Sequence, residues 1–285
     1  MTKIISFTLL WIFSQNVLAQ SGWTRDKKGL YAKAGYSFLR SADFYNSDGV
    51  LIKTDYIQQH AVLFYAEYGL SNRITAILNA PIYKSTGYES APYKPASGVG
   101  DVLLELKYSL TRGSFPVSIS IAPELPTGNP KALQYDKFGG YTVLPTGDGE
   151  FNVWTKTAVS HSFYPLNAYA SLSGSYNFRT MGFTNQYMGG IEMGYKLFNK
   201  IWTKAALRTF GTAGTPNPVL LAAIGIGEGI AYNAYNFGLS YELMKHLSCT
   251  FDYYNLVGRP NNIYSGHNFV IGIAADLNFS KSPSQ

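Results

Sequence analysis

The sequence is poor in charge and in cysteine, and each shortage excludes a class of protein. Charged residues make up 14% of the 285 positions, whereas soluble globular proteins usually carry about 25%. Cys249 stands alone, so it can form neither a disulfide framework nor a cysteine-based zinc site. None of the four histidines stands at the spacing of metal ligands. We therefore expect no metal and no cofactor.

Long apolar runs are also missing after the first residues. A membrane-spanning helix needs about 20 apolar residues, and the mean hydropathy of the chain is only −0.06. Aromatic residues are nevertheless frequent, with 23 Tyr and 17 Phe, and the chain contains 28 Gly. This combination is typical of a membrane β-barrel, in which apolar and polar residues alternate and the average hydropathy cancels.

Positive charge exceeds negative charge, but the excess is scattered along the chain. The formal net charge is +6 and the isoelectric point is about 9.1, yet no run of four Lys or Arg residues occurs. Dispersed charge of this kind does not indicate a nucleic-acid partner, and we expect none. It suits the lumen and loops of a barrel, with outer-membrane lipid and lipopolysaccharide as the expected surroundings.

Residues 1–19 have the pattern of a secretion signal. Lys3 provides the positive start, residues 4–13 form a short apolar stretch, and Val17 and Ala19 are acceptable residues at the expected cleavage site. The apolar stretch is too short to span a membrane as a helix. We expect this signal to be removed and residues 20–285 to form a single outer-membrane β-barrel domain.

A period of two residues runs through the rest of the chain and is clearest in residues 266–279. There Phe269 and Ile271 lie on one face of the expected strand, whereas Asn268 and Asp276 lie on the other. The same pattern predicts twelve strands, at residues 29–44, 55–69, 73–83, 100–110, 115–124, 151–164, 166–179, 186–198, 201–210, 229–243, 247–256 and 267–279.

The connections between these strands alternate in length. Short turns follow the second, fourth, sixth, eighth and tenth strands, and longer loops separate the others. Outer-membrane barrels combine short periplasmic turns, long outer loops and an even number of strands. The sequence therefore predicts an all-β fold, a transmembrane antiparallel up-and-down β-barrel of about twelve strands in the bacterial outer membrane. The barrel assembly machinery is then an expected partner.

The expected registers place many ionisable side chains on the inner face of the barrel. Opposite charges inside a narrow barrel must pair or be hydrated, because an isolated buried charge is costly. A twelve-stranded barrel can hold either a thin channel or a lumen filled by salt bridges. A selective pore and a plugged structural or surface-anchoring barrel are therefore both open hypotheses. The predicted lumen-lining residues are Lys33, Glu67, Glu105, Lys107, Lys156, Arg179, Glu192, Lys196, Lys204, Arg208, Glu242, Asp252 and Asp276.

One long loop, at residues 211–228, is unusually apolar. Exposed apolar surface usually marks an interaction site, so this loop is a candidate gate or a hydrophobic cargo site at the barrel mouth. Packing on lipopolysaccharide and an extra hairpin are the alternatives. The residues that would form the gate are Val219, Leu220, Leu221, Ile224 and Ile226.

An outer-membrane lipid hydrolase is a third hypothesis. Such an enzyme needs a serine and a histidine close together near the outer rim. His60 and His267 are the candidates for that position, and Ser265 lies two residues from His267. No Gly-x-Ser-x-Gly motif occurs, and histidines beside Tyr and Phe suit an aromatic belt better. We expect the protein not to be an enzyme.

Residues 99–180 carry the motifs VGDVLLELKYSL, FPVSISIAPELPTG and LPTGDGEFNVWTK. These motifs resemble those of outer-membrane proteins assigned to phenol-degradation pathways. The resemblance implies a transporter-like channel barrel that takes up small hydrophobic organic compounds passively, and it implies no catalytic residues. One departure is that six residues follow Phe279, whereas such barrels often end on the aromatic residue itself.

Overall fold

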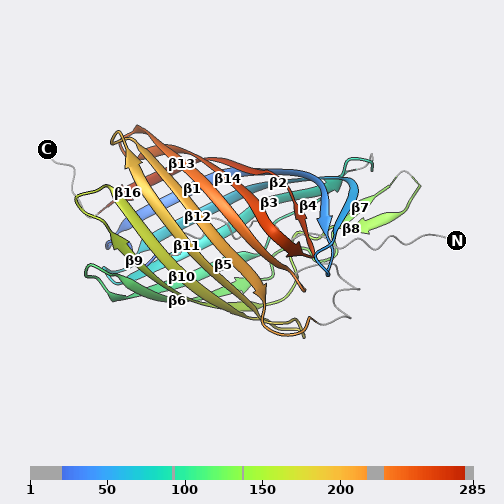
Figure 1. Ribbon diagram of the computed structural model, residues 1–285, viewed down its shortest axis with the longest axis horizontal. Coiled ribbons are helices and arrows are strands. Elements are labelled where there is room, and N and C mark those ends of the chain that lie inside the picture. Colours follow the sequence, from blue (N-terminus) through green and yellow to red (C-terminus); the bar gives the residue numbers. More distant parts are fainter. Residues whose placement is uncertain (1–20, 92–93, 137, 217–227, 280–285) are drawn as a thin grey trace.

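The computed structural model describes residues 21–91, 94–136, 138–216 and 228–279, and these residues form a β-barrel. The strands are inclined to the long axis of the barrel (Figure 1). Among the described residues, no helix is long and apolar enough to cross a membrane.

Twelve antiparallel strands make up the barrel wall, and each pairs with the next. They are β1 (Gly29–Tyr45), β2 (Leu51–Gly69), β3 (Ile74–Tyr88), β5 (Val102–Thr111), β6 (Val117–Leu125), β9 (Asn152–Ser162), β10 (Ala168–Phe178), β11 (Gln186–Leu197), β12 (Ile201–Thr212), β13 (Ala231–Met244), β14 (Leu247–Asn261) and β16 (Asn268–Asn278). β1 pairs with β2 on one side and with β16 on the other, so the wall is closed. Closure leaves no unpaired sheet edge facing lipid.

Four short strands add to this wall or lie beyond it. They are β4 (Ala96–Gly98), β7 (Leu133–Tyr135), β8 (Tyr141–Val143) and β15 (Ile263–Ser265). β4 pairs with β3 and β15 pairs with β1, whereas β7 and β8 form a separate hairpin. This hairpin projects beyond one end of the barrel (Figure 1).

The alternating sequence gives the wall two different faces. In β5, Glu105 and Lys107 are buried, whereas Leu104 and Leu106 are 42% and 49% exposed. Exposed apolar side chains of this kind recur along the other wall strands. Such a surface is stable against hydrocarbon and not against water. The wall is therefore apolar on the outside and polar on the inside.

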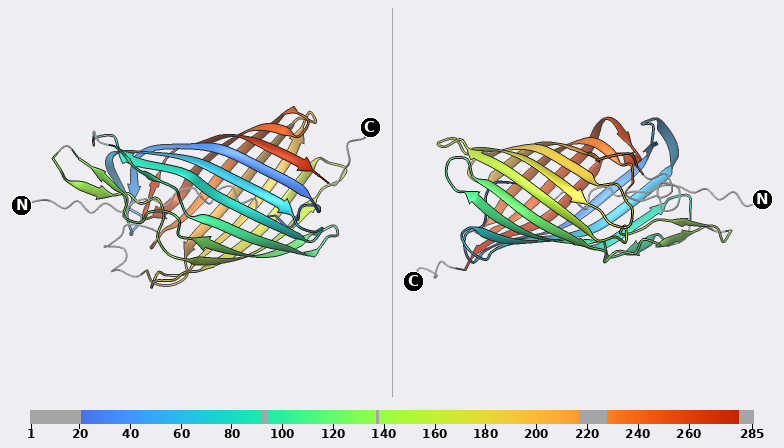
Figure 2. Two further views of the ribbon diagram at one scale, coloured as in Figure 1. Left: turned by 180° about the vertical axis from the view of Figure 1, so that it is seen from behind. Right: turned by 90° about the horizontal axis from the view of Figure 1, so that it is seen from below.

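The connections divide the barrel into a short-turn end and a long-loop end (Figure 2). The short-turn end holds the brief connections that follow β2, β5, β9, β11 and β13, together with the start of β1 and the end of β16. The largest connection at the long-loop end runs from β6 to β9 and includes the β7–β8 hairpin. Buried apolar side chains gather inside the barrel toward this end, among them Leu39, Ile57, Leu144, Trp154 and Tyr264.

The prediction of a twelve-stranded antiparallel barrel is confirmed, whereas several predicted strand boundaries are wrong. β2 begins at Leu51 rather than at residue 55, β3 ends at Tyr88 rather than at 83, and β14 ends at Asn261 rather than at 256. The strands continue because residues beyond the apolar stretch still pair, as Asp43 does with Lys53. These extensions use polar side chains, so the apolar period does not mark them.

Candidate functional site

The predicted lumen-lining residues share a strand face with the buried residues of their strands, or lie just beyond a strand end. The buried members are Lys33, Glu105, Lys107, Lys156, Arg179 and Asp252. The more exposed members are Glu67, Glu192, Lys196, Lys204, Arg208, Glu242 and Asp276. Most of the exposed members lie toward the short-turn end, so the interior is more accessible there than at the long-loop end.

One carboxylate holds two ammonium groups on the inner wall. Asp252 on β14 lies 2.7 Å from Lys33 Nζ on β1 and 3.0 Å from Lys204 Nζ on β12. The side chains of Lys33 and Asp252 are 8% and 3% exposed, whereas that of Lys204 is 30% exposed. The three formal charges sum to +1, and the Lys204 side chain is the most exposed of the three.

Two further ion pairs join side chains of different wall strands. Lys156 Nζ on β9 donates to Glu105 on β5 at 2.7 Å, across the intervening strand β6. Arg208 on β12 lies 3.7 Å from Glu192 on β11. Lys107 is only 4% exposed, and within the described ranges its side chain makes no hydrogen bond or ion pair, although its positive charge acts on Glu105.

At the long-loop end, the segment 144–151 folds into the barrel mouth, and we call it the inner loop. The carboxylate of Asp101 accepts hydrogen bonds from the backbone N–H groups of Gly128 and Asp148, each at 2.9 Å. Lys84 Nζ on β3 donates to the carbonyl of Thr146 at 2.8 Å. Gly147 packs on Asp101 so closely that a Cβ would lie 2.3 Å from a carboxylate oxygen. The inner loop is thus fixed to the wall from several sides.

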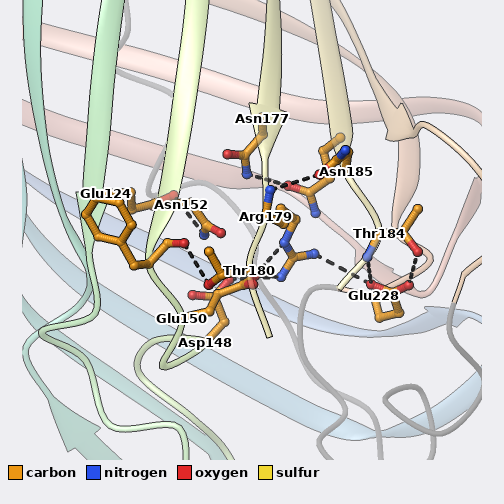
Figure 3. Close-up of polar contacts among 12 residues, drawn as sticks. Glu124, Asp148, Glu150, Asn152, Asn177, Arg179, Thr180, Thr184, Asn185 and Glu228 are labelled. Atoms are coloured by element: carbon orange, nitrogen blue, oxygen red, sulfur yellow. Dashed lines mark hydrogen bonds and ion pairs between the residues drawn. The ribbon is translucent and has the colours of Figure 1, made fainter. Parts of the chain in front are cut away.

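Arg179 anchors the inner loop from the end of β10 (Figure 3). Its side chain is fully buried, pairs with Glu150, lies 3.2 Å from Asp148 and lies 3.7 Å from Glu228. Its guanidinium also lies 4.3 Å from the ring centre of Phe183. Of these residues only Arg179 was predicted to line the lumen, because Asp148, Glu150 and Glu228 stand in predicted loops.

The cluster around Arg179 carries more negative charge than the arginine can balance. Burial raises the pKa of the Asp148 carboxyl well above its usual range; the negative charge of Glu124 adds to the rise, and Arg179 opposes it. Burial also raises the pKa of the Glu150 carboxyl, again against the effect of Arg179. Protons are therefore held more tightly in the inner loop than in the unfolded chain.

At the short-turn end, residues 21–28 run across the lumen before β1 begins, and we call them the N-terminal strap. Ser118 Oγ on β6 donates to the carbonyl of Ser21 at 3.0 Å, and the N–H of Gly22 donates to Ser160 Oγ on β9 at 2.8 Å. The ring of Trp23 meets Tyr169 on β10 edge to face, with centroids 5.7 Å apart. The strap thus reaches the wall opposite its own strand.

Arg25 ties the same strap to the other side of the barrel. Its N–H donates to Thr75 Oγ1 on β3 at 2.8 Å, and its guanidinium lies 2.9 Å from both Glu67 and Asp276. The guanidinium also lies 5.0 Å from the ring centre of Tyr31. The two carboxylates were predicted to line the lumen, whereas Arg25 was not, because it precedes the first strand and so has no place in the strand pattern.

Two parts of the sequence interpretation fall outside the described residues. The proposed gate residues, Val219 to Ile226, lie within 217–227. The predicted signal lies within residues 1–20. Both stay predictions.

The histidines considered for a hydrolase lie on the outer face of the wall. His60 alternates with the buried Gln59 and Ala61, and its Nδ1 is hydrogen-bonded to the hydroxyl of Tyr36. His267 Nδ1 lies 2.7 Å from the hydroxyl of Tyr253. Contacts of this kind are those of an aromatic belt at a membrane interface.

A closed antiparallel barrel with an apolar outer face, a polar inner face and two unequal ends is an integral β-barrel of the bacterial outer membrane. Its short-turn end is the periplasmic end. No family model matches the chain, and no curated protein matches it.

Several solved structures share this fold. The chain is similar to an outer membrane channel from Pseudomonas putida F1, with 13% identity, 90% of this chain and 97% of that chain covered, and a TM-score of 0.67. It is also similar to the NanC porin, with 11% identity, 87% and 100% covered, and a TM-score of 0.51. The KdgM porin follows with 8% identity, 86% and 99% covered, and a TM-score of 0.50. At these identities the similarity establishes the fold.

Proposed function

We propose that the protein is an outer-membrane channel through which small organic solutes diffuse passively. The observation that carries this proposal is the charged, ion-paired inner wall, seen in the Lys33–Asp252–Lys204 trio and the Glu105–Lys156 pair. Buried ion pairs often stabilise a fold no better than apolar residues of similar size. A barrel that served only as an anchor does not need such a wall, whereas a channel can use it to accommodate polar or hydrated cargo.

Two relationships support the proposal. The barrel shares its fold with an outer membrane channel over nearly the whole length of both chains. The motifs in residues 99–180 resemble outer-membrane proteins of phenol-degradation pathways, which supports small organic compounds as the cargo. The similar structures described above are a channel and two porins, and we infer no enzymatic activity.

The lumen is narrowed at both ends, which predicts a low conductance. The N-terminal strap crosses the short-turn end, and the inner loop occupies the long-loop end. The side chains of Arg25 and Asp276 are 27% and 61% exposed. Exposed ion pairs contribute only about 0–1 kcal/mol to stability. The N-terminal strap is therefore the easier of the two obstacles to displace.

A structural barrel with a filled lumen is the second candidate, and the Arg179 cluster favours it. A fully buried arginine among three carboxylates is the kind of network that holds a plug in place. The two candidates differ in one consequence. A channel must let solutes past the inner loop, whereas a filled barrel must exclude them.

Liposome swelling separates these two functions. The folded full chain is reconstituted into liposomes, which are then exposed to solutes of increasing size. A channel predicts swelling with small organic solutes and none with large ones, and the variant Arg25→Ala should swell faster than the wild type. The variant Lys27→Ala is the control, because the Lys27 side chain makes no ion pair within the described residues. Absence of swelling for every solute and variant would support the filled barrel instead.

A further inference from the structure

A cavity of about 190 Å³ lies on the inner wall beside the Lys33–Asp252–Lys204 trio. It is partly open and lies toward the short-turn end, where β1, β10, β12, β13 and β14 contribute to its lining. An engineered apolar cavity of about 150 Å³ in another protein holds a benzene molecule. This cavity therefore has room for one substituted aromatic ring.

Two aromatic rings, those of Tyr169 and Trp202, line part of the cavity. Tyr169 packs on Gly194, where a Cβ would lie 2.0 Å from its Cε1, and its hydroxyl donates to Glu192 at 2.9 Å. The ring of Trp202 lies 5.9 Å from that of Tyr169 and is tilted by 56°. Trp202 is 40% exposed although it points inward. These rings offer π surface to a planar ligand at little entropic cost.

The lining of the cavity also presents positive charge and a hydroxyl group. Gly238 makes room for the charged trio, because a Cβ there would lie 2.4 Å from Lys204 Cε and 2.6 Å from Asp252 Oδ1. Thr250 also lines the cavity, is only 9% exposed, and its Oγ1 has no hydrogen-bond partner in the described part of the chain. A buried hydroxyl left unpaired is costly, so an occupant that bonds to it is favoured.

We propose that this cavity binds a small aromatic monoanion, of the benzoate type, on its way through the lumen. The proposal rests on the channel function, because the cavity is reached through the lumen. The ring lies against Trp202 and Tyr169, while the carboxylate accepts hydrogen bonds from Lys204 Nζ and Thr250 Oγ1. The net charge of +1 on the trio matches a monoanion, whereas a neutral ring leaves that charge uncompensated and a dianion exceeds it. The cavity then selects its ligand by both the negative charge and the aromatic ring of that ligand.

Calorimetric titration of the folded full chain in detergent tests the class of ligand. Three probes are compared: benzoate, benzyl alcohol with the same ring but no charge, and cyclohexanecarboxylate with the same charge but no aromatic ring. Benzoate should bind at least about tenfold more tightly than either, since a charge-assisted hydrogen bond and an aromatic contact are each lost in one analogue. Its affinity should also fall as salt is added.

Variants locate the site on the inner wall. Lys204→Met and Trp202→Leu should each weaken benzoate binding about tenfold, because each removes one of the proposed contacts with the ligand. Lys107→Met removes an equal charge from β5, nearly opposite in the strand order, and should leave binding unchanged. Lys204→Arg keeps the charge and should retain most of the affinity. Heat-modifiable migration on a gel verifies that each variant is folded.

The outcomes separate this site from the channel function. Equal binding of benzoate and either analogue, or equal loss in Lys204→Met and Lys107→Met, would overturn the site. If Lys204→Met does not fold, Lys204→Arg and Trp202→Leu decide the matter in the same titration. Solute flux without benzoate binding would reject the proposed site and leave the channel function standing. Site-specific binding without any flux would support the site and reject the channel function.

Discussion

Arg25 Nε lies 2.9 Å from the Glu67 carboxylate, so a residue that precedes β1 is fixed to the end of β2. Together with the hydrogen bonds of Ser21 and Gly22 to the far wall, this pair holds the N-terminal strap across the periplasmic end of the lumen. Loss of one anchor should therefore change access to the lumen without changing the wall.

The strap should loosen when its guanidinium is removed. Arg25→Ala deletes bonds to Glu67 and Asp276 whose partners are partly exposed, so we expect a local cost of about 1 kcal/mol. Amide hydrogen exchange in residues 21–28 should then be about fivefold faster, while exchange in β2 and β16 stays slow. Lys27→Ala is the control in the same segment. Identical exchange in the wild type and Arg25→Ala would show that the strap is held by its other contacts alone.

Arg179 should matter far more for stability than an exposed arginine. Arg179→Met leaves Asp148, Glu150 and Glu228 buried without their cation, and breaking such a buried pair typically costs about 3–5 kcal/mol. Arg112→Met is the matched control, because Arg112 is 45% exposed and lies 3.7 Å from the exposed Asp26. It should cost less than about 1 kcal/mol. Equal thermal unfolding of the two variants would contradict a structural role for the Arg179 cluster.

Two glycines on neighbouring strands should respond differently to the same added methyl group. In Gly194→Ala the new Cβ would lie 2.0 Å from Tyr169 Cε1, so the ring must move, at a cost of about 1–3 kcal/mol. In Gly174→Ala nothing lies within 4 Å of the new Cβ, and stability should be unchanged or slightly higher. Thermal unfolding and tryptophan fluorescence, which reports on Trp23 and Trp202 beside Tyr169, measure both effects. Equal behaviour would mean that Tyr169 is not held against Gly194.

The inner loop should become less stable as the pH rises. Burial raises the pKa of Asp148, so the folded state binds its proton more tightly than the unfolded chain does. Stability is then lost as the pH increases from the ordinary aspartate range through the raised pKa. The ionisable groups that act on Asp148 in the described part of the chain are Lys84, Asp101, Glu124, Glu150 and Arg179, and Arg179 in turn lies 3.7 Å from Glu228.

Asp148→Asn tests this dependence, because the amide keeps an oxygen for Arg179 but does not titrate. Hydrogen exchange of the inner loop in the wild type should accelerate as the pH rises above the ordinary aspartate range, beyond the intrinsic increase of amide exchange. The variant should show a flatter profile. A wild-type profile as flat as that of the variant would mean that Asp148 does not control the loop.

The barrel could be predicted from the sequence because apolar and polar residues alternate within each strand. In β5, the outward Leu104 and Leu106 alternate with the inward Glu105 and Lys107, the pattern typical of a wall strand between lipid and lumen. The inward positions of Lys33, Lys204 and Asp252 follow from the same period. That both lysines pair with Asp252 could not be predicted, because the pairing depends on which strands close the barrel and at what stagger.

The loops and the strap were beyond prediction for a different reason. Asp148 and Glu150 stand in a glycine-rich stretch that reads as an exposed loop, and only the fold brings them to Arg179. Arg25 precedes the first strand and has no periodic neighbours. The inward positions of Tyr169 and Trp202 could be predicted from the register of their strands. Aromatic residues at inward positions do not by themselves indicate a binding site, however.

Single-channel conductance in planar lipid bilayers tests the central claim most directly. The folded full chain should give small, discrete conductance steps, and Arg25→Ala should give larger or longer openings because the strap no longer holds the periplasmic end. Lys27→Ala should behave like the wild type. Folded wild-type and Arg25→Ala proteins that insert into the bilayer and never conduct would contradict the account and identify a filled barrel.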